Sequence, residues 1–260
     1  MISPVFTNKE EWKAFLDYIY EKYNDFSYIG TDPAMWIYRF SDRGDMERAG
    51  FYASSLALGN VKSMNKFLFS FFSALPKPMS LCGALSYDEI LCRIDGLYYR
   101  FFDSRMLASL VFATEAMYKR YGSLELWFKH HLCHVSDMRL VLSSMSRELR
   151  ENMPVDVGIM LPLPESKGTW KRLLLYLRWM IRRDNIDLGL WEGVSPSVLY
   201  VPLDVHMQRL CRSAGFLKRK SNDFKAVSEV TDFFRNLCPD DPVRYDFALT
   251  RLGMKAEAES

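Results

Sequence analysis

The chain lacks the features that mark membrane-spanning and secreted proteins. Its longest mostly apolar run, Phe67 to Leu75, is far shorter than the about 18 or more residues of a membrane-spanning helix. No basic segment followed by an apolar stretch opens the chain, so we expect no signal peptide. Of the 260 residues, 49% are hydrophobic and 25% are charged, which is typical of a globular protein and argues against disorder. We expect a globular protein without a membrane partner.

Cysteine is scarce and its spacing is wrong for a metal cluster. The five cysteines are an odd number and form no C-x-x-C pair, whereas an iron–sulfur cluster needs several thiolates at close spacing. A chain of this length does not depend on disulfides, so we expect free, mostly buried thiols in the reducing cytoplasm. The sequence also indicates no cofactor.

Histidine is rare, and three of the four histidines lie in the segment His130-His131-Leu132-Cys133-His134. His130 and His134 share a helix face, which is a possible metal pair. No third or fourth ligand is evident and the H-E-x-x-H motif is absent, so half-exposed histidines at a helix end are the simpler interpretation. A metal enzyme would need acidic or thiol groups around this pair.

Several catalytic signatures are missing as well. The chain has no P-loop, no G-x-G-x-x-G and no G-x-S-x-G, which disfavours kinases, dinucleotide enzymes and α/β-hydrolases. The 34 basic and 32 acidic residues leave a net charge of only +2. This balance neither requires nor excludes a nucleic-acid partner, because a local basic patch can lie on a nearly neutral chain.

Hydrophobic residues recur with helical period along nearly the whole chain, so the predicted fold class is all-α. Strand signals are scarce, and Val198 to Val201 is the best candidate. The tail from residue 255 to residue 260 is expected to be disordered. The expected helices are one after a Thr7–Glu10 capping box, a pair over 45–58 and 61–74 broken at Gly59-Asn60, one from Asp103 or Ser104 to Gly122, one capped by Ser136, one from near Thr169, and two over 223–237 and 242–252.

Lys171 is a candidate nucleophile. It is expected in the first turn of a strongly apolar helix, beside Arg172. The positive end of the helix dipole and the neighbouring guanidinium both favour the uncharged amine, which a Schiff-base nucleophile requires. The alternative is a surface lysine on the polar face of the helix, which local sequence alone favours.

Asp204 follows Pro202 in a short apolar segment and is expected to cap the helix that begins after it. Capping alone is the simpler role, although a capping carboxylate can also be catalytic. His206 lies two positions further on, in the first turn, where a side chain can meet a phosphate.

Taken together, these segments resemble the helix-hairpin-helix (HhH-GPD) DNA glycosylases, the superfamily of endonuclease III and the 8-oxoguanine DNA glycosylases. Leu163 to Lys171 resembles the hairpin that precedes the family's catalytic lysine, and Pro202 to Met207 resembles its V-D-x-H segment. Further matches, in chain order, are Phe51–Asn60, Gly96–Arg100 and Val230–Leu237. The chain is most similar to the archaeal 8-oxoguanine glycosylase branch and to an uncharacterised bacterial family with the signature K-R-L-x-x-x-L-R-W-M, which runs from Lys171 to Met180.

Two departures from the family pattern stand out. The hairpin has one glycine, Gly168, where the family pattern usually has two. The two glycines allow the backbone to approach phosphate closely, so the missing glycine affects the expected contact between the hairpin and DNA. The interval between Lys171 and Asp204 is longer than in most of the superfamily, and an inserted loop over about 184–200 accounts for it. The archaeal branch has a similarly long interval. If the register differs, Lys167 is the alternative nucleophile.

The resemblance implies one glycosylase module over residues 1–254, built of two helical lobes with a cleft between them. The hairpin and catalytic helix (about 163–183) lie in one lobe, and the terminal helices belong partly to the other. The Asp-bearing segment covers 201–214. The implied function is a base-excision-repair DNA glycosylase with AP lyase activity that removes a damaged base, expected to be an oxidised purine, from duplex DNA as a monomer.

The resemblance also assigns roles to individual residues. Lys171 and Asp204 are catalytic, and Trp170, Tyr245 and Asp246 line the base pocket. DNA contacts come from Gly168, His206, Arg172 and Asn60, of which Asn60 fills the gap left by the flipped base. Basic residues Arg178, Arg182 and Arg183 either widen this footprint or pair with acids inside the protein. The alternative function is a non-catalytic helical module that binds DNA or a protein partner through the inherited cleft.

Overall fold

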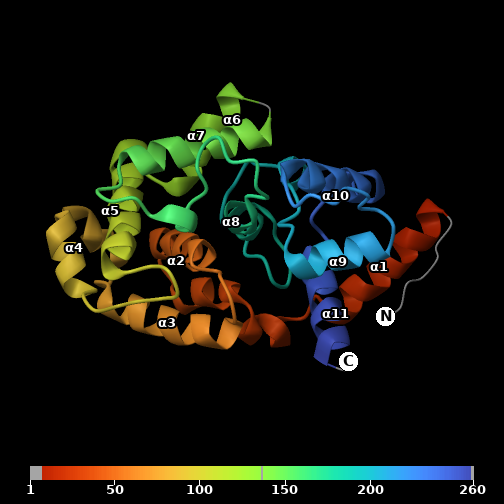
Figure 1. Ribbon diagram of the computed structural model, residues 1–260, viewed down its shortest axis with the longest axis horizontal. Coiled ribbons are helices and arrows are strands. Elements are labelled where there is room, and N and C mark those ends of the chain that lie inside the picture. The colour runs from red at the N-terminus through yellow and green to blue at the C-terminus, as the bar shows by residue number, and fades with distance from the viewer. Residues whose placement is uncertain (1–7, 136, 259–260) are drawn as a thin grey trace. The chain divides into compact units, whose positions relative to one another are not determined.

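The computed structural model describes residues 8–135 and 137–258, which form two compact units (Figure 1). Unit 1 combines the N-terminal residues up to Ile29 with the chain from Lys167 to the C-terminus, and unit 2 is Gly30–Ser166. The described residues form α-helices and short 3-10 helices and contain no strand, which confirms the all-α prediction. No helix in this part of the chain has the length and apolar composition needed to cross a membrane.

The described residues of unit 2 form a cluster of six α-helices. Asp103 accepts a hydrogen bond from the Met106 amide at the start of the longest helix, and Gly122 ends this helix in the left-handed conformation, as the sequence predicts. The helices are α2 (Arg43–Ser55), α3 (Val61–Ala74), α4 (Tyr87–Arg93), α5 (Ser104–Tyr121), α6 (Leu124–His134) and α7 (Met138–Glu151). The 3-10 helix η2 (Pro33–Arg39) precedes α2, η3 (Met79–Ala84) lies between α3 and α4, and η4 (Gly158–Met160) follows α7. The 3-10 helix η1 (Phe26–Thr31) spans the boundary between the units in the sequence.

A buried ion pair joins α2 to α5 inside unit 2. Arg48 binds Glu115 through two hydrogen bonds of 2.6 and 2.8 Å, and its guanidinium stacks on the ring of Tyr118 at 3.5 Å. Both charged side chains are buried. Because removing one partner of such a pair leaves an uncompensated charge in the interior, each partner depends on the other.

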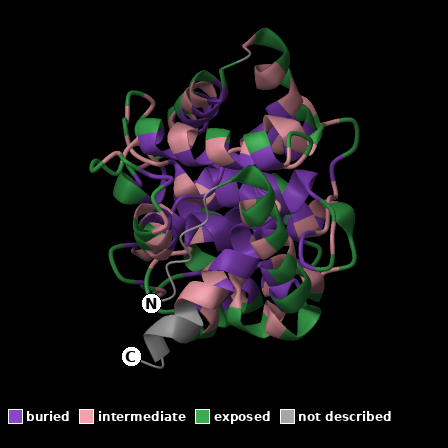
Figure 2. Ribbon diagram, turned by 90° about the vertical axis from the view of Figure 1, so that its right-hand side faces the viewer, coloured by how far each residue is buried: buried purple, intermediate pink, exposed green. Residues whose placement is uncertain are grey.

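Unit 1 is built around α8 (Lys171–Ile181), whose residues from Leu173 onward are all buried. A helix that is apolar on every side belongs in the interior, and the leucine-rich sequence of α8 places it there. The helices α1 (Lys9–Tyr23) and α9 (Val205–Ser213) both pack against α11 (Asp246–Ala258), as Figure 1 shows. The fifth helix is α10 (Phe224–Leu237), and the short 3-10 helix η5 (Pro196–Val198) lies in the loop before Asp204. In Figure 2 the helices carry buried residues, in purple, on their inner faces.

Three expectations about the ends of the chain are wrong. The terminal helices α1, α10 and α11 belong to the same unit as α8 and not to the other one. The last helix begins at Asp246 and not near Pro242, because the amides of Arg244 and Asp246 bond three residues back to form turns. The helix then extends to Ala258, into the segment predicted as a disordered tail.

Other local predictions also need correction. Val198 to Val201 is not a strand, because Val198 ends η5 and the Val201 amide donates to the Thr231 hydroxyl at 3.1 Å. Asn8 caps α1 and Asp137 caps α7, while the predicted caps Thr7 and Ser136 lie outside the described residues. The cysteines are free, but fewer are buried than expected: Cys82 and Cys211 are buried, Cys238 is half-buried, and Cys92 and Cys133 are exposed.

We predict that Glu115→Ala lowers the free energy of unfolding by about 3–5 kcal/mol, because it leaves Arg48 buried without its carboxylate. Replacing both partners, as Arg48→Met/Glu115→Leu, should cost less than the single change. The control is Arg105→Ala, whose side chain is 68% exposed and which should change stability by about 0.5 kcal/mol or less. Urea unfolding of the four proteins measures this, and a Glu115→Ala variant as stable as the control contradicts it.

Candidate active site

Lys171 is the first residue of α8, as the sequence predicts. The preceding Trp170 has a left-handed backbone (φ 55°) and is buried, and its carbonyl accepts the first helical hydrogen bond from Leu174 at 3.1 Å. A bulky residue in this region is strained by about 1–3 kcal/mol, and such strain is concentrated at functional sites. The conformation of Trp170 therefore fixes the direction in which the chain enters α8 at Lys171.

Asp204 is held at the start of α9 by both ends of its segment. Upstream, the Val201 amide binds the hydroxyl of Thr231 on α10. At Asp204 itself, Oδ1 accepts from the Met207 amide at 2.8 Å, which is the predicted helix cap. This bond leaves Oδ2 directed elsewhere.

The second carboxylate oxygen meets the candidate nucleophile. Lys171 Nζ lies 3.5 Å from Asp204 Oδ2, which is an ion-pair distance and longer than a strong hydrogen bond. The Lys171 side chain is 35% exposed and the Asp204 side chain 17% exposed, so a molecule from solution can reach the pair. The structure thus brings together the two residues that sequence reasoning named as catalytic. A carboxylate at this distance can hold the amine in place and stabilise positive charge that develops beside it.

A buried ion pair lies behind this site. Arg178, two turns along α8 from Lys171, contacts Asp246 at the start of α11 and binds Asp187 at 3.1 Å. Burial raises the pKa of Asp246 to about 6, although the charge of Arg178 opposes this, and the nearby charge of Asp204 raises the pKa further. Asp246 is therefore coupled electrostatically to Asp204.

The network continues through Arg182, which is also buried. Its guanidinium binds Asp187 at 2.8 Å, Asp184 at 2.5 Å and Asp241 at 2.7 Å. Asp184 also accepts a 2.9 Å bond from the Tyr20 hydroxyl on α1. Arg178 and Arg182 therefore pair with acids inside the protein and do not widen the basic footprint, whereas Arg183 is exposed.

The loop between α8 and α9 supplies two of these acids and also closes α8. The amides of Gly189 and Trp191 donate to the carbonyls of Trp179 and Met180 at the end of the helix, at 3.1 and 2.8 Å. Gly189 has a φ of 55°, and a Cβ there would lie 2.7 Å from the Cβ of Arg183. This loop is thus a tightly fitted support of α8.

The three residues predicted to line a base pocket are all buried. Asp246 is 5% exposed and its carboxylate engages Arg178, and its place in a base pocket stays a prediction. The Tyr245 hydroxyl donates to Asp17 at 2.8 Å, and Trp170 precedes α8 as described. Asp246 and Tyr245 connect α11 to the rest of unit 1.

The predicted DNA-contacting residues differ in exposure. His206 is the second residue of α9 and is half-exposed, in the first turn as expected. Arg172 is half-buried, and although burial lowers its pKa to about 10, its guanidinium stays charged at neutral pH. Gly168 follows the turn in which the Ser166 amide donates to the Leu163 carbonyl at 2.9 Å.

Asn60 belongs to unit 2 and caps α3. Its Oδ1 accepts from the amides of Lys62 and Ser63 at 2.9 and 3.3 Å, and the residue is exposed. The turn after Gly96 lies next to it, because the Tyr99 hydroxyl donates to the Leu58 carbonyl. Two of the segments that carry the family resemblance are thus neighbours within unit 2.

The histidine cluster does not assemble a metal site in the described part of the chain. His130 and His134 are neighbours, with ring centroids 4.8 Å apart. His131 instead meets Glu148 at 2.9 Å, and burial lowers the pKa of its ring. Glu148 also accepts from Trp127 and Tyr121, so it is part of the packing of unit 2.

Sequence reasoning missed two supports of the site, Asp187 and Thr231. Asp187 lies in the inserted loop, where only its proximity to the arginine-rich end of α8 hinted at pairing. Thr231 gave no signal beyond its place in the segment Val230–Leu237, yet its hydroxyl holds the chain before Asp204.

The comparisons with known proteins identify the family and nothing more specific. A family described as "Protein of unknown function (DUF2400)" matches residues 32–255, so the chain belongs to this family. The match includes Lys171, Asp204 and the acids of the buried network, and it excludes α1. No curated protein and no solved structure matches the chain.

We predict that Asp246 gives the stability of unit 1 a dependence on pH. Its pKa in the folded protein, about 6, is above the ordinary value of 3.8, so the folded state binds the proton more tightly. The stabilisation of the folded state by this tighter proton binding is therefore full below about pH 4, and it is lost as the pH rises through about 6. The difference in unfolding free energy between wild type and Asp246→Asn should change by up to about 3 kcal/mol across this window.

Chemical denaturation between pH 4 and pH 7 measures this difference. Asp232→Asn, on an exposed part of α10, is the matched control and should keep the wild-type profile. If the Asp246→Asn profile runs parallel to the wild type throughout, Asp246 does not titrate in this range.

Proposed function

We propose that this protein is a DNA glycosylase with AP lyase activity that removes a damaged base, expected to be an oxidised purine, from duplex DNA. The observation that carries the proposal is the 3.5 Å approach of Lys171 Nζ to Asp204 Oδ2. The chemistry requires an amine and a carboxylate at one sugar carbon, and these two side chains come from different helices to meet at a solvent-accessible point. The resemblance of both segments to the helix-hairpin-helix glycosylases supports the same conclusion.

In the proposed reaction the damaged nucleotide is rotated out of the duplex, at an unpairing cost of a few kcal/mol. After the Lys171 ammonium loses a proton to water, its amine attacks the anomeric carbon and the bond from that carbon to the base breaks. The base leaves with the bonding electrons and takes up the proton that the attacking nitrogen releases. Asp204 stabilises the positive charge that develops on the sugar. Opening of the sugar ring then gives an imine between Lys171 and the anomeric carbon.

The lyase step follows from the imine. Loss of a proton from the neighbouring sugar carbon supplies the electrons that expel the 3′ phosphate, and water then hydrolyses the imine to release the enzyme. His206 and the amides near Gly168 are proposed to hold backbone phosphates. A non-catalytic DNA- or protein-binding module is the alternative, and the proximity of Lys171 to Asp204 weighs against it.

We predict that Lys171→Gln abolishes the covalent adduct that borohydride traps on a lesion-containing duplex. The variant loses the nucleophile but only one positive charge, so its affinity for DNA should stay within a few-fold of wild type. Lys167→Gln is the matched control, because Lys167 is exposed and is the alternative nucleophile. A panel of lesions identifies the base, and an undiminished adduct from Lys171→Gln transfers the role to Lys167 or ends the lyase proposal.

We predict that Asp204→Asn keeps the fold and slows base excision by about 10²–10³-fold, because the carboxylate charge is lost where the sugar becomes positive. Asparagine also caps helices, so the free energy of unfolding should change by about 1 kcal/mol or less. Single-turnover excision and thermal unfolding on the same samples separate the two effects. Wild-type turnover by a folded Asp204→Asn variant would make Asp204 a helix cap only.

A further inference from the structure

A basic loop, residues 214–223, connects α9 to α10 and is anchored firmly on its inner side. Phe216 is buried and stacks on Phe233 of α10, with ring centroids 4.3 Å apart and planes 6° from parallel. Trp12 of α1 packs edge-on against both rings. The loop is therefore fixed to two helices of unit 1.

The polar contacts of the loop fix its outer side as well. Arg212 donates to the carbonyls of Arg219 and Lys220 at 3.2 and 2.9 Å and to the Asn222 side chain at 2.7 Å. The amide of Lys218 donates to Glu229 at 2.7 Å. These bonds use backbone atoms of the basic residues and leave the lysine ammonium groups to face solvent.

The stretch from Lys218 to Lys225 contains four basic residues and one acid, Asp223. That acid is already paired with Arg219, at 2.7 and 2.5 Å. Lys218, Lys220 and Lys225 are exposed, and among the described residues no carboxylate pairs with them. We call these three side chains the lysine face.

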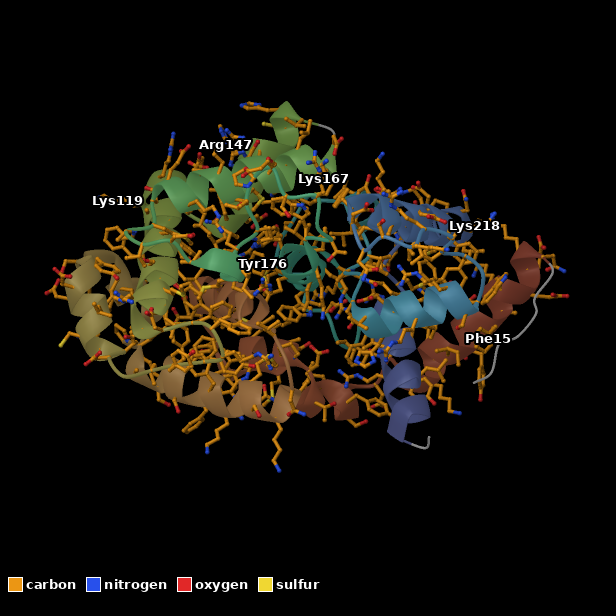
Figure 3. The ribbon with its side chains drawn as sticks, viewed as in Figure 1. Phe15, Lys119, Arg147, Lys167, Tyr176 and Lys218 are labelled. Carbon is orange, nitrogen blue, oxygen red and sulfur yellow. The ribbon has the colours of Figure 1, made fainter. Side chains whose placement is uncertain are left out.

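The lysine face is joined to the hairpin that precedes the candidate active site. The amide of Phe224, next to Lys225, donates to the carbonyl of Lys167 at 2.9 Å. Lys167 is itself exposed and precedes Gly168. In Figure 3 the labelled Lys167 and Lys218 both lie on the α10 side of unit 1, away from α11. The start of α10, which carries Lys225, therefore lies next to Lys167 within unit 1.

We propose that the lysine face binds the phosphate backbone of duplex DNA next to the damaged nucleotide. This inference rests on the proposed DNA substrate and adds where the duplex is held. Ammonium groups without paired carboxylates, held on an anchored loop, can bind the phosphates of a polyanion. DNA that binds to them releases condensed counterions, and this release favours binding. The hairpin has one glycine fewer than the family pattern, and the lysine face supplies phosphate contacts beside it. A chain with a net charge of only +2 needs its positive charge concentrated in this way to hold DNA.

The test compares Lys218→Ala/Lys220→Ala with a control of equal charge change in the same unit, Lys9→Ala/Lys22→Ala on α1. All four lysines are exposed. Binding to a duplex with a stable abasic analogue is titrated from about 0.05 to 0.3 M NaCl. We expect the loop variant to bind about ten- to a hundredfold more weakly near 0.1 M, with a slope of log K against log salt smaller by about 0.9 per lysine. The control should match wild type, and Lys218→Arg/Lys220→Arg should restore the slope.

Equal slopes for the loop variant and wild type, or equal losses in the loop variant and the α1 control, overturn the proposal. Borohydride trapping at saturating enzyme distinguishes this failure from failure of the proposed function. If trapping succeeds while the slope is unchanged, the glycosylase stands and the lysine face does not bind DNA. If trapping fails on every lesion while the slope falls as expected, the lysine face binds DNA in a protein that lacks the proposed imine chemistry.

Discussion

The structure of unit 1 depends on the burial of two arginines in its central helix. Arg178 and Arg182 lie one turn apart on α8 and both are buried. Taking a guanidinium out of water costs several kcal/mol unless carboxylates meet it with good geometry. The acids come from the inserted loop and from the segment at the start of α11, so segments far apart in the chain must meet at α8 before the unit is stable.

This requirement explains how the candidate catalytic pair is held. Lys171 begins the helix that the network fixes, and α9, which Asp204 caps, packs on the helix that carries Asp246. Asp204 uses one carboxylate oxygen for its cap and the other for Lys171, so the cap and the contact with Lys171 do not compete for the same atom. The charge network thus links the geometry of the site to the stability of the unit. The charge of Asp204 also raises the pKa of Asp246, so the site and the network interact electrostatically.

The sequence predicted the parts of this arrangement that local patterns determine. Helical periodicity identified the all-α class, and the positions of Lys171 and Asp204 at helix starts followed from apolar spacing and capping chemistry. Ion pairs between segments far apart in the sequence were not predictable. The same hydrophobic spacing in a helix is compatible with an arginine that faces solvent and with one that faces a buried acid. Asp246 shows the limit, since its place in the chain suggested a pocket residue, while its burial against Arg178 follows only from the packing of α11.

Basic charge in unit 1 is divided between the interior and the surface. The arginines of α8 at positions 178 and 182 are neutralised in the interior and contribute little to the field outside, because the acids around them carry compensating charge. The lysines of the loop before α10 have no such partners in the described part of the chain, and solvent-exposed charge is what a polyanion meets first. Residue type divides the two roles as physical chemistry suggests: the planar, multidentate guanidinium suits buried carboxylate networks, and the strongly hydrated ammonium suits a water-exposed phosphate surface. A nearly neutral chain can in this way contain both a charged core and a basic face.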